Sequence, residues 1–269
     1  MTAAANVDVA VIGGSGLYAL LDDTTELTIK TPYGAPSDVI TVGEVTGRQV
    51  AFLPRHGRDH RLPPHRIPYR ANVWALRSLG VRQILAPCAV GGLRPELGPG
   101  TFVVPDQFVD RTSGRTQTFH DVGAVHVAMA DPYCVDGRAT VRSAAAEVGV
   151  NIVDGGTMVV VEGPRFSTRA ESQWFAGQGW SLVNMTGYPE AVLARELELC
   201  YTPIALVTDL DAGVEHGTGV TQDEVFRVFG ENMTRMRRLV LQALPALPTR
   251  RTCECSHALD GIDVKLALP

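Results

Sequence analysis

The stretch Val7-Asp8-Val9-Ala10-Val11-Ile12-Gly13-Gly14-Ser15-Gly16 decides the fold of this chain. Its first six residues are rich in β-branched and other apolar side chains, and the run ends in glycine. An apolar run of this kind is typical of a central strand that is buried on both faces of a sheet, and the glycines predict a tight turn after it. Functional residues often lie at such strand ends.

The segments that follow add antiparallel strands and a helix. Residues 39–45 and 48–53 are β-rich, and Thr46-Gly47 between them predicts a hairpin. Residues 69–79 follow a proline, carry apolar side chains at helical spacing and stop at Gly80, which predicts a helix.

Strand and helix patterns alternate along the rest of the chain, which indicates the α/β class. A capping box at Thr221-Gln-Asp-Glu224 opens a long amphipathic helix, whose apolar side begins with Val225 and Phe226. We expect one domain over residues 1–250, closed by this helix, and a C-terminal tail over 251–269. The other predicted strands are 81–86, 101–104, 157–161, 181–184 and 203–208, and the other predicted helices are 138–148 and 189–199.

Composition narrows the functional classes. The 269 residues are 45% apolar, which is ample for a buried core and excludes a disordered chain. A net charge of −5 gives no broad basic field, so we expect neither nucleic acid nor a membrane as a partner. We expect a cytoplasmic protein, because the chain starts without a basic signal region and its apolar runs fall short of the roughly 20 residues of a membrane helix. Five scattered cysteines do not resemble a secreted disulfide framework, and we expect mostly reduced thiols at Cys88, Cys134, Cys200, Cys253 and Cys255.

Two segments have the chemistry of an anion site. In Gly13-Gly14-Ser15-Gly16, small residues let backbone amides converge on phosphate, and Ser15 adds a hydroxyl donor. The same glycines also fit a dinucleotide fingerprint, although too few helical residues precede the hairpin for a standard βαβ unit. In the charged loop after residue 53, Arg55 can direct two hydrogen bonds to phosphate and His56 another. The alternatives are a charged loop that is merely solvated and a metal bound by the three histidines, His56, His60 and His65.

Three further segments offer contacts to a ligand. Residues 86–92 form a small-residue turn whose amides complete an anion site or serve only as a structural turn. Phe166 either stacks on a flat base or belongs to the core. Thr186 offers a hydroxyl to a ligand or caps the helix that starts near Pro189.

Asp209 and Asp211 follow an apolar strand and present two carboxylates together. Protonated by its surroundings, one can donate to a ring nitrogen, while the other accepts from an exocyclic amine. The alternative is a solvated turn or a helix cap. Near the end of the chain, Cys253-Glu-Cys255-Ser-His257 is open to three interpretations, a plain surface tail, a redox-linked pair or a metal ligand set.

Taken in order, GGSGL, PRHGRDH, CAVGGLR, DQFVDRT, EGPRFSTRAES, NMTGYPE and TDLD resemble the methylthioadenosine phosphorylase branch of the purine nucleoside phosphorylases over residues 7–245. This resemblance implies a mixed, twisted central sheet flanked by helices in one domain. It also implies a homotrimer, or a dimer of trimers, with active sites near the subunit interfaces. It further implies neither a metal nor an organic cofactor, with inorganic phosphate as a co-substrate.

The resemblance also assigns roles to residues. Phosphate would be held by Ser15, Arg55, His56, Cys88, Ala89 and Thr186. The nucleoside would contact Phe166, Met185, Asp209, Leu210 and Asp211, with His126 reaching its 5′ end from a neighbouring subunit. Ser167 and Gln222 would set specificity, and Asp209, His56 and Thr186 would carry the catalysis.

The chemistry implied is phosphorolysis of S-methyl-5′-thioadenosine, with inversion at the anomeric carbon. Two residues depart from the family pattern. Cys88 stands where many relatives have threonine and is a weaker donor, and Gln222 stands where an apolar residue is usual. General phosphorolysis of adenosine or 6-oxopurine nucleosides is therefore the near alternative. An NAD-dependent dehydrogenase and a non-catalytic nucleotide-binding module are remote ones.

Overall fold

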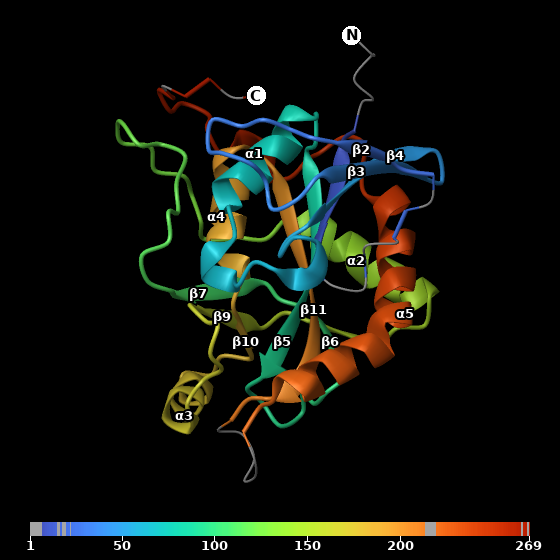
Figure 1. Ribbon diagram of the computed structural model, residues 1–269, viewed down its shortest axis with the longest axis vertical. Helices are drawn as coiled ribbons and strands as arrows, with labels where there is room; N and C mark the ends of the chain where they lie inside the picture. The colour runs from blue at the N-terminus through green and yellow to red at the C-terminus, as the bar shows by residue number, and fades with distance from the viewer. Residues whose placement is uncertain are drawn as a thin grey trace.

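The computed structural model describes residues 7–14, 17, 20–21, 23–212, 219–264, 266–267 and 269. The chain forms one mixed sheet with helices on both faces (Figure 1), which confirms the predicted α/β class. The strands are β1 Val9–Gly13, β2 Thr25–Leu27, β3 Ile40–Val45, β4 Arg48–Pro54, β5 Gln83–Gly92, β6 Phe102–Val104, β7 Gln107–Arg111, β8 Ile152–Asp154, β9 Thr157–Val161, β10 Leu182–Asn184 and β11 Cys200–Leu210. The helices are α1 Tyr69–Ser78, α2 Val135–Glu147, α3 Arg169–Gly177, α4 Gly187–Glu196 and α5 Gln222–Ala246.

Strand β1 shows why the opening run is almost continuously apolar. Ala10 and Ile12 belong to the core on one face of the sheet, while Val9 and Val11 belong to the core on the other face. Successive strand side chains point to opposite faces, so a strand covered on both sides needs apolar residues throughout. Helices α1 and α4 pack together over the first face, and α2 and α5 over the second (Figure 1).

The sheet branches at β5. Its main order is β2-β3-β4-β1-β5-β10-β9-β7, and β11 also pairs with β5 and carries β6 and β8 beyond it. The predicted hairpin is present as β3 and β4, and its turn residues Thr46 and Gly47 have φ values of 51° and 79°, as a two-residue hairpin turn requires.

Strand β5 corrects one expectation. Residues 86–92 were expected to form a turn, but β5 runs through them to Gly92. The reason is long-range pairing, because β11 pairs in parallel with β5 from Gln83 to Gly92. The sequence patterns also gave no strand for β2, β7 or β8 and no helix for α3.

Helix α5 behaves differently in its two halves. Thr221 caps it by accepting a hydrogen bond from the Glu224 amide, as predicted. The second half is anchored in the core by Met236, Leu239 and other side chains.

The part of the chain that the structure describes contains no helix with the length and hydrophobicity needed to span a membrane.

The tail is not a plain surface segment at its cysteines. Cys253 is 5% exposed and Cys255 is 3% exposed, and both pack on the body of the protein beside the short 3-10 helix Glu254–His257. This finding contradicts the surface interpretation for these two residues.

Candidate active site

A cavity of about 460 Å³ opens where β1, β4, β5, β10 and β11 end. Leu210 and His126 are not among its lining residues. Ser15 lies outside the described residues, next to Gly14, which lines the cavity. The sequence-predicted residues that do line it are Arg55, His56, Cys88, Ala89, Phe166, Ser167, Met185, Thr186, Asp209, Asp211 and Gln222.

Arg55 lies at the floor of the cavity and is only 2% exposed. Its Nε donates to Oε1 of Glu190 at 2.9 Å, and its Nη2 donates to Oε2 at 2.9 Å. Nη2 and Nη1 also donate to the carbonyls of Ile12 and Pro87, each at 3.0 Å. Four of the five N–H groups are thus engaged, so the two-pronged face predicted to grip phosphate is occupied by Glu190.

Glu190 has 0% exposure and also accepts from the Tyr201 hydroxyl at 2.6 Å. Burial alone would lower the pKa of Arg55, but Glu190 more than reverses this and leaves the pKa raised. Glu190 was not predicted as a functional residue. Its only sequence signal is a carboxylate in the first turn of a helix that follows a strand end.

His56 enters the cavity as a neutral ring. Its Nδ1 lies 2.9 Å from the carbonyl oxygen of Leu62, and a carbonyl only accepts, so the proton is on Nδ1. Burial lowers the pKa of His56 to about 3, and the ring stacks on His60 at a centroid distance of 4.1 Å. Nε2 therefore presents a lone pair to a ligand, whereas the sequence had suggested a donor.

The open edge of β5 supplies a backbone donor. On that edge, β1 pairs only with residues 83–85 and β10 only with Gly91 and Gly92. The Ala89 carbonyl points into the gap between them, where it accepts from Asn184 Nδ2 at 3.1 Å. Because the N–H and C=O of a strand residue point the same way, the Ala89 amide faces the gap too. Cys88 beside it is 8% exposed, and burial raises its thiol pKa to about 12, so it stays protonated.

The Thr186 side chain does not cap helix α4, because Asn184 accepts the hydrogen bonds of the first amides instead. It occupies the N-cap position of α4 but makes no side-chain capping bond. Asn184 Oδ1 instead accepts from the amides of Thr186 and Gly187, at 2.8 Å and 2.7 Å. Thr186 lines the cavity and its side chain does not cap the helix, which favours the ligand-binding alternative.

Asp209 is 7% exposed and lies just after an irregularity in the register between β11 and β5. Bulges of this kind re-aim side chains, and here Thr208 and Asp209, adjacent in sequence, both line the cavity. Burial raises the pKa of Asp209 to about 6, while a 2.7 Å hydrogen bond from the Thr208 hydroxyl works in the opposite direction. The carboxyl therefore exchanges a proton just below neutral pH.

Asp211 is 3% exposed, and its Oδ2 is buried without a hydrogen-bond partner among the described residues. Burial raises its pKa, and hydrogen bonds from Ser167 and Ser172 oppose the rise. An unpaired buried carboxylate oxygen is costly, and in a cavity wall it marks the place for a ligand donor. Leu210 between the two aspartates does not line the cavity.

Apolar side chains also line the cavity. Phe166 remains 36% exposed and lines the cavity, so it is not a core residue. Met185 lies against Gly163, whose φ is +62°, and a Cβ atom there would come within 2.6 Å of its sulfur. Val225, Phe226 and Phe229 of α5 also line the cavity. The helical periodicity had assigned the last three to packing, because a binding wall and a core face have the same pattern.

Among the residues that the structure describes, the three histidines do not come together as a metal site. His56 and His60 line the cavity, but His65 does not, since it lies on a separate cavity with Tyr69 and Arg70. His126, expected to act on a neighbouring subunit, is exposed on the connection between β7 and α2.

Known proteins are similar to this chain in sequence and in fold. The model of the phosphorylase superfamily matches residues 8–245. A purine nucleoside phosphorylase of Streptomyces coelicolor is 61% identical, with 97% of this chain and 98% of that protein covered. An S-methyl-5′-thioadenosine phosphorylase of Mycolicibacterium smegmatis is 59% identical, with 96% and 98% covered. The crystal structure of a methylthioadenosine phosphorylase from an antarctic soil metagenomic library has a TM-score of 0.89 at 40% identity, with 95% of this chain and 92% of that chain covered. This chain belongs to the phosphorylase superfamily.

Proposed function

We propose that the protein is a pentosyltransferase that cleaves purine nucleosides with inorganic phosphate, and that S-methyl-5′-thioadenosine is its preferred substrate. The products are adenine and S-methyl-5-thioribose 1-phosphate. The observation that carries the proposal is the pair of buried aspartates in the cavity wall. Burial raises the pKa of both, and Asp211 has an unpaired oxygen. A 6-aminopurine supplies both a ring nitrogen that accepts and an amine that donates.

One part of the cavity offers hydrogen-bond donors to phosphate. The part lined by Arg55, His56, Ala89 and Thr186 offers the remaining guanidinium N–H, a backbone amide and a hydroxyl, which suit phosphate. The neutral His56 accepts at Nε2, so it is matched to the one P–OH group of the phosphate dianion. Glu190 occupies the two-pronged face of the Arg55 guanidinium, so Arg55 does not bind the phosphate through that face.

The reaction follows from the phosphate contacts and the two aspartates. As the glycosidic bond stretches, the sugar becomes positive and the base negative. Phosphate stabilises the sugar and attacks its anomeric carbon from the side opposite the base, which inverts that carbon. Protonated Asp209 donates to N7 of the departing purine, while Asp211 accepts from the exocyclic amine.

A second candidate is general phosphorolysis of adenosine or 6-oxopurine nucleosides. It is favoured by Gln222, an amide on the cavity wall, and by the similarity to a protein named purine nucleoside phosphorylase. Against it, Val225, Phe226 and Phe229 make the adjoining wall apolar, and this wall suits a methylthio group better than a hydroxyl. A carboxylate also repels a 6-oxo oxygen.

One assay separates these candidates. Purified protein is incubated with methylthioadenosine, adenosine or inosine, with and without phosphate, and the free base is resolved by chromatography. We expect phosphate-dependent adenine release, fastest from methylthioadenosine. Faster cleavage of inosine would contradict the role given to the aspartates, and intact nucleosides in every mixture would exclude phosphorolysis and leave a binding module. In a separate mixture that also contains NAD⁺, a change in nicotinamide absorbance would indicate the dehydrogenase instead.

We also infer a cytoplasmic homotrimer. His126 is exposed on a connection that does not reach its own cavity, as a residue that serves a neighbouring subunit would be. Sedimentation at equilibrium tests the assembly, and the variant His126→Ala tests the role through the KM for the nucleoside.

A further inference from the structure

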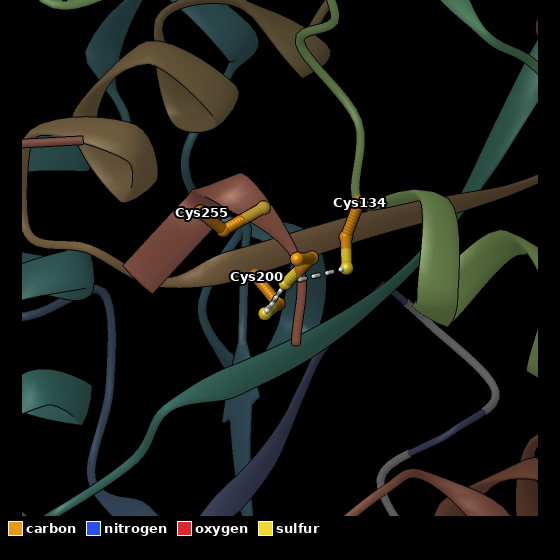
Figure 2. A group of neighbouring side chains, drawn as sticks. Cys134, Cys200 and Cys255 are labelled. Carbon is orange, nitrogen blue, oxygen red and sulfur yellow. Dashed lines mark hydrogen bonds between the residues drawn. The ribbon is translucent and has the colours of Figure 1, made fainter. Parts of the chain in front are cut away.

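Four of the five cysteines meet in one buried cluster. Cys134, Cys200, Cys253 and Cys255 are between 1% and 5% exposed, and all four are free thiols. They form a core cluster that contains no other buried apolar residue among those described. Figure 2 shows Cys134, Cys200 and Cys255 converging from three different parts of the chain.

The cluster joins the tail to two elements of the body. Cys134 is the residue before α2, Cys200 is the first residue of β11, and Cys253 and Cys255 belong to the tail. Cys200 and Asp209 lie near opposite ends of β11, nine residues and about 30 Å apart at the rise of a strand. The cluster is therefore remote from the candidate active site.

The sulfur positions fit a tetrahedral site. The four Sγ atoms lie within 4.8 Å of one another, and Cys253 Sγ is 3.6 Å from Cys134 Sγ and 3.4 Å from Cys200 Sγ. With zinc–sulfur bonds of about 2.3 Å, the sulfurs of a zinc tetrathiolate are about 3.8 Å apart. Small side-chain adjustments therefore bring all four thiols onto one ion.

The N-terminus of helix α2 lies beside the cluster. The amide of Gly137, in the first turn of α2, donates to Cys134 Sγ at 3.4 Å, and the N-terminus of that helix favours negative charge.

We propose that Cys134, Cys200, Cys253 and Cys255 bind one Zn²⁺ ion as a tetrathiolate and that this ion fastens the C-terminal tail to α2 and β11. Binding replaces four S–H bonds by four Zn–S bonds and releases four protons, with no change of oxidation state. A set of four protein ligands leaves no open coordination position, so the ion is structural. Two of these ligands come from the body and two from the tail, and the ion contributes folding free energy by joining them.

The test is metal content. The full chain is purified with a thiol reductant and without chelator, and zinc is measured by plasma mass spectrometry. We expect one zinc per chain in the wild type and less than a tenth of that in the double variant Cys253→Ser/Cys255→Ser. The matched control is Cys88→Ser, which changes the one cysteine outside the cluster and is expected to keep its zinc.

A second measurement covers the case in which the double variant fails to fold. Wild-type protein is stripped with a chelator under reducing conditions and titrated with Co²⁺, which gives strong visible absorption when four thiolates bind it tetrahedrally. We expect those bands at one equivalent, their loss on addition of Zn²⁺, and a Tm that falls on stripping and returns with Zn²⁺. Absence of zinc together with no Co²⁺ bands, or intact-mass evidence for disulfides in the reduced preparation, would overturn the proposal.

Discussion

Arg55 and Glu190 form a buried, two-pronged ion pair 135 residues apart in sequence, with Nε–Oε1 and Nη2–Oε2 distances of 2.9 Å. Both side chains are almost fully withdrawn from solvent, at 3% and 0% exposure. The pair connects the end of β4 to α4 and so fixes the floor of the cavity.

Replacing Glu190 by glutamine should be strongly destabilising. Glu190→Gln leaves the Arg55 charge buried without its counter-charge, and breaking such a pair costs about 3–5 kcal/mol. We expect the free energy of unfolding in urea to fall by that order at fixed protein concentration. Glu231→Gln, which removes the exposed partner of Arg227, is the control and should change stability by less than about 1 kcal/mol. Equal stability of the two variants would contradict a structural role for Glu190.

The pH dependence of catalysis should report on Asp209. Its pKa is raised to about 6, and the proton is required for donation to N7, so kcat/KM for the nucleoside should fall as pH rises through that value. Asp209→Asn should lose roughly 100-fold or more in activity, and this limb should disappear from its pH profile. Phosphate titrates in both enzymes, so the difference between the two profiles isolates Asp209. An unchanged limb in the variant would assign it to another group.

The same variant should be more stable than the wild type in alkaline solution. A pKa raised from 3.8 to about 6 means that the folded state binds more protons, so stability falls as pH rises through this window. Above it, the buried charge costs up to about 3 kcal/mol. We expect Asp209→Asn to gain up to that amount at pH 8 and about half as much at pH 5. Gln173→Asn, an uncharged exchange at an exposed site, is the control and should show no such pH dependence.

A better donor at Cys88 should strengthen phosphate binding. The thiol is a weak donor, its pKa is raised to about 12, and it lines the cavity beside the Ala89 amide. In Cys88→Ser, a hydroxyl bond to an anion is worth about 1.5 kcal/mol, which lowers the KM for phosphate by up to about tenfold. The KM for the nucleoside serves as the internal control and should not move. A higher KM for phosphate would show that Cys88 does not face the anion.

Gln222 should control the choice at the 5′ position. It begins α5 on the cavity wall, next to apolar Val225. Gln222→Leu should raise the ratio of kcat/KM for methylthioadenosine over adenosine by about tenfold, because an apolar side chain favours methylthio and cannot pair with a hydroxyl. The exposed Gln173→Leu on α3 is the matched control and should leave the ratio unchanged. A ratio that moves equally in both variants would remove Gln222 from the specificity site.

The sequence by itself determined the elements whose signals are local. The run before Gly13 required a strand covered on both faces, Thr46-Gly47 required a tight hairpin, and the pattern of residues 69–79 required a helix. The motif residues of the cavity were also recognisable, because a ligand site places particular side chains at strand ends and the chain carries them there in order.

Tertiary structure alone decided the contacts between distant segments. Pairing with β11 extends β5 beyond residue 86. The Arg55 guanidinium binds Glu190, and Phe226 lines the cavity. Tertiary structure also brought Cys134 and Cys200 to the cysteines of the tail. The physical reason is the same in each case. Strand pairing, charge neutralisation and the approach of the four sulfurs depend on which segments meet after folding, and residue spacing along the chain does not determine which segments meet.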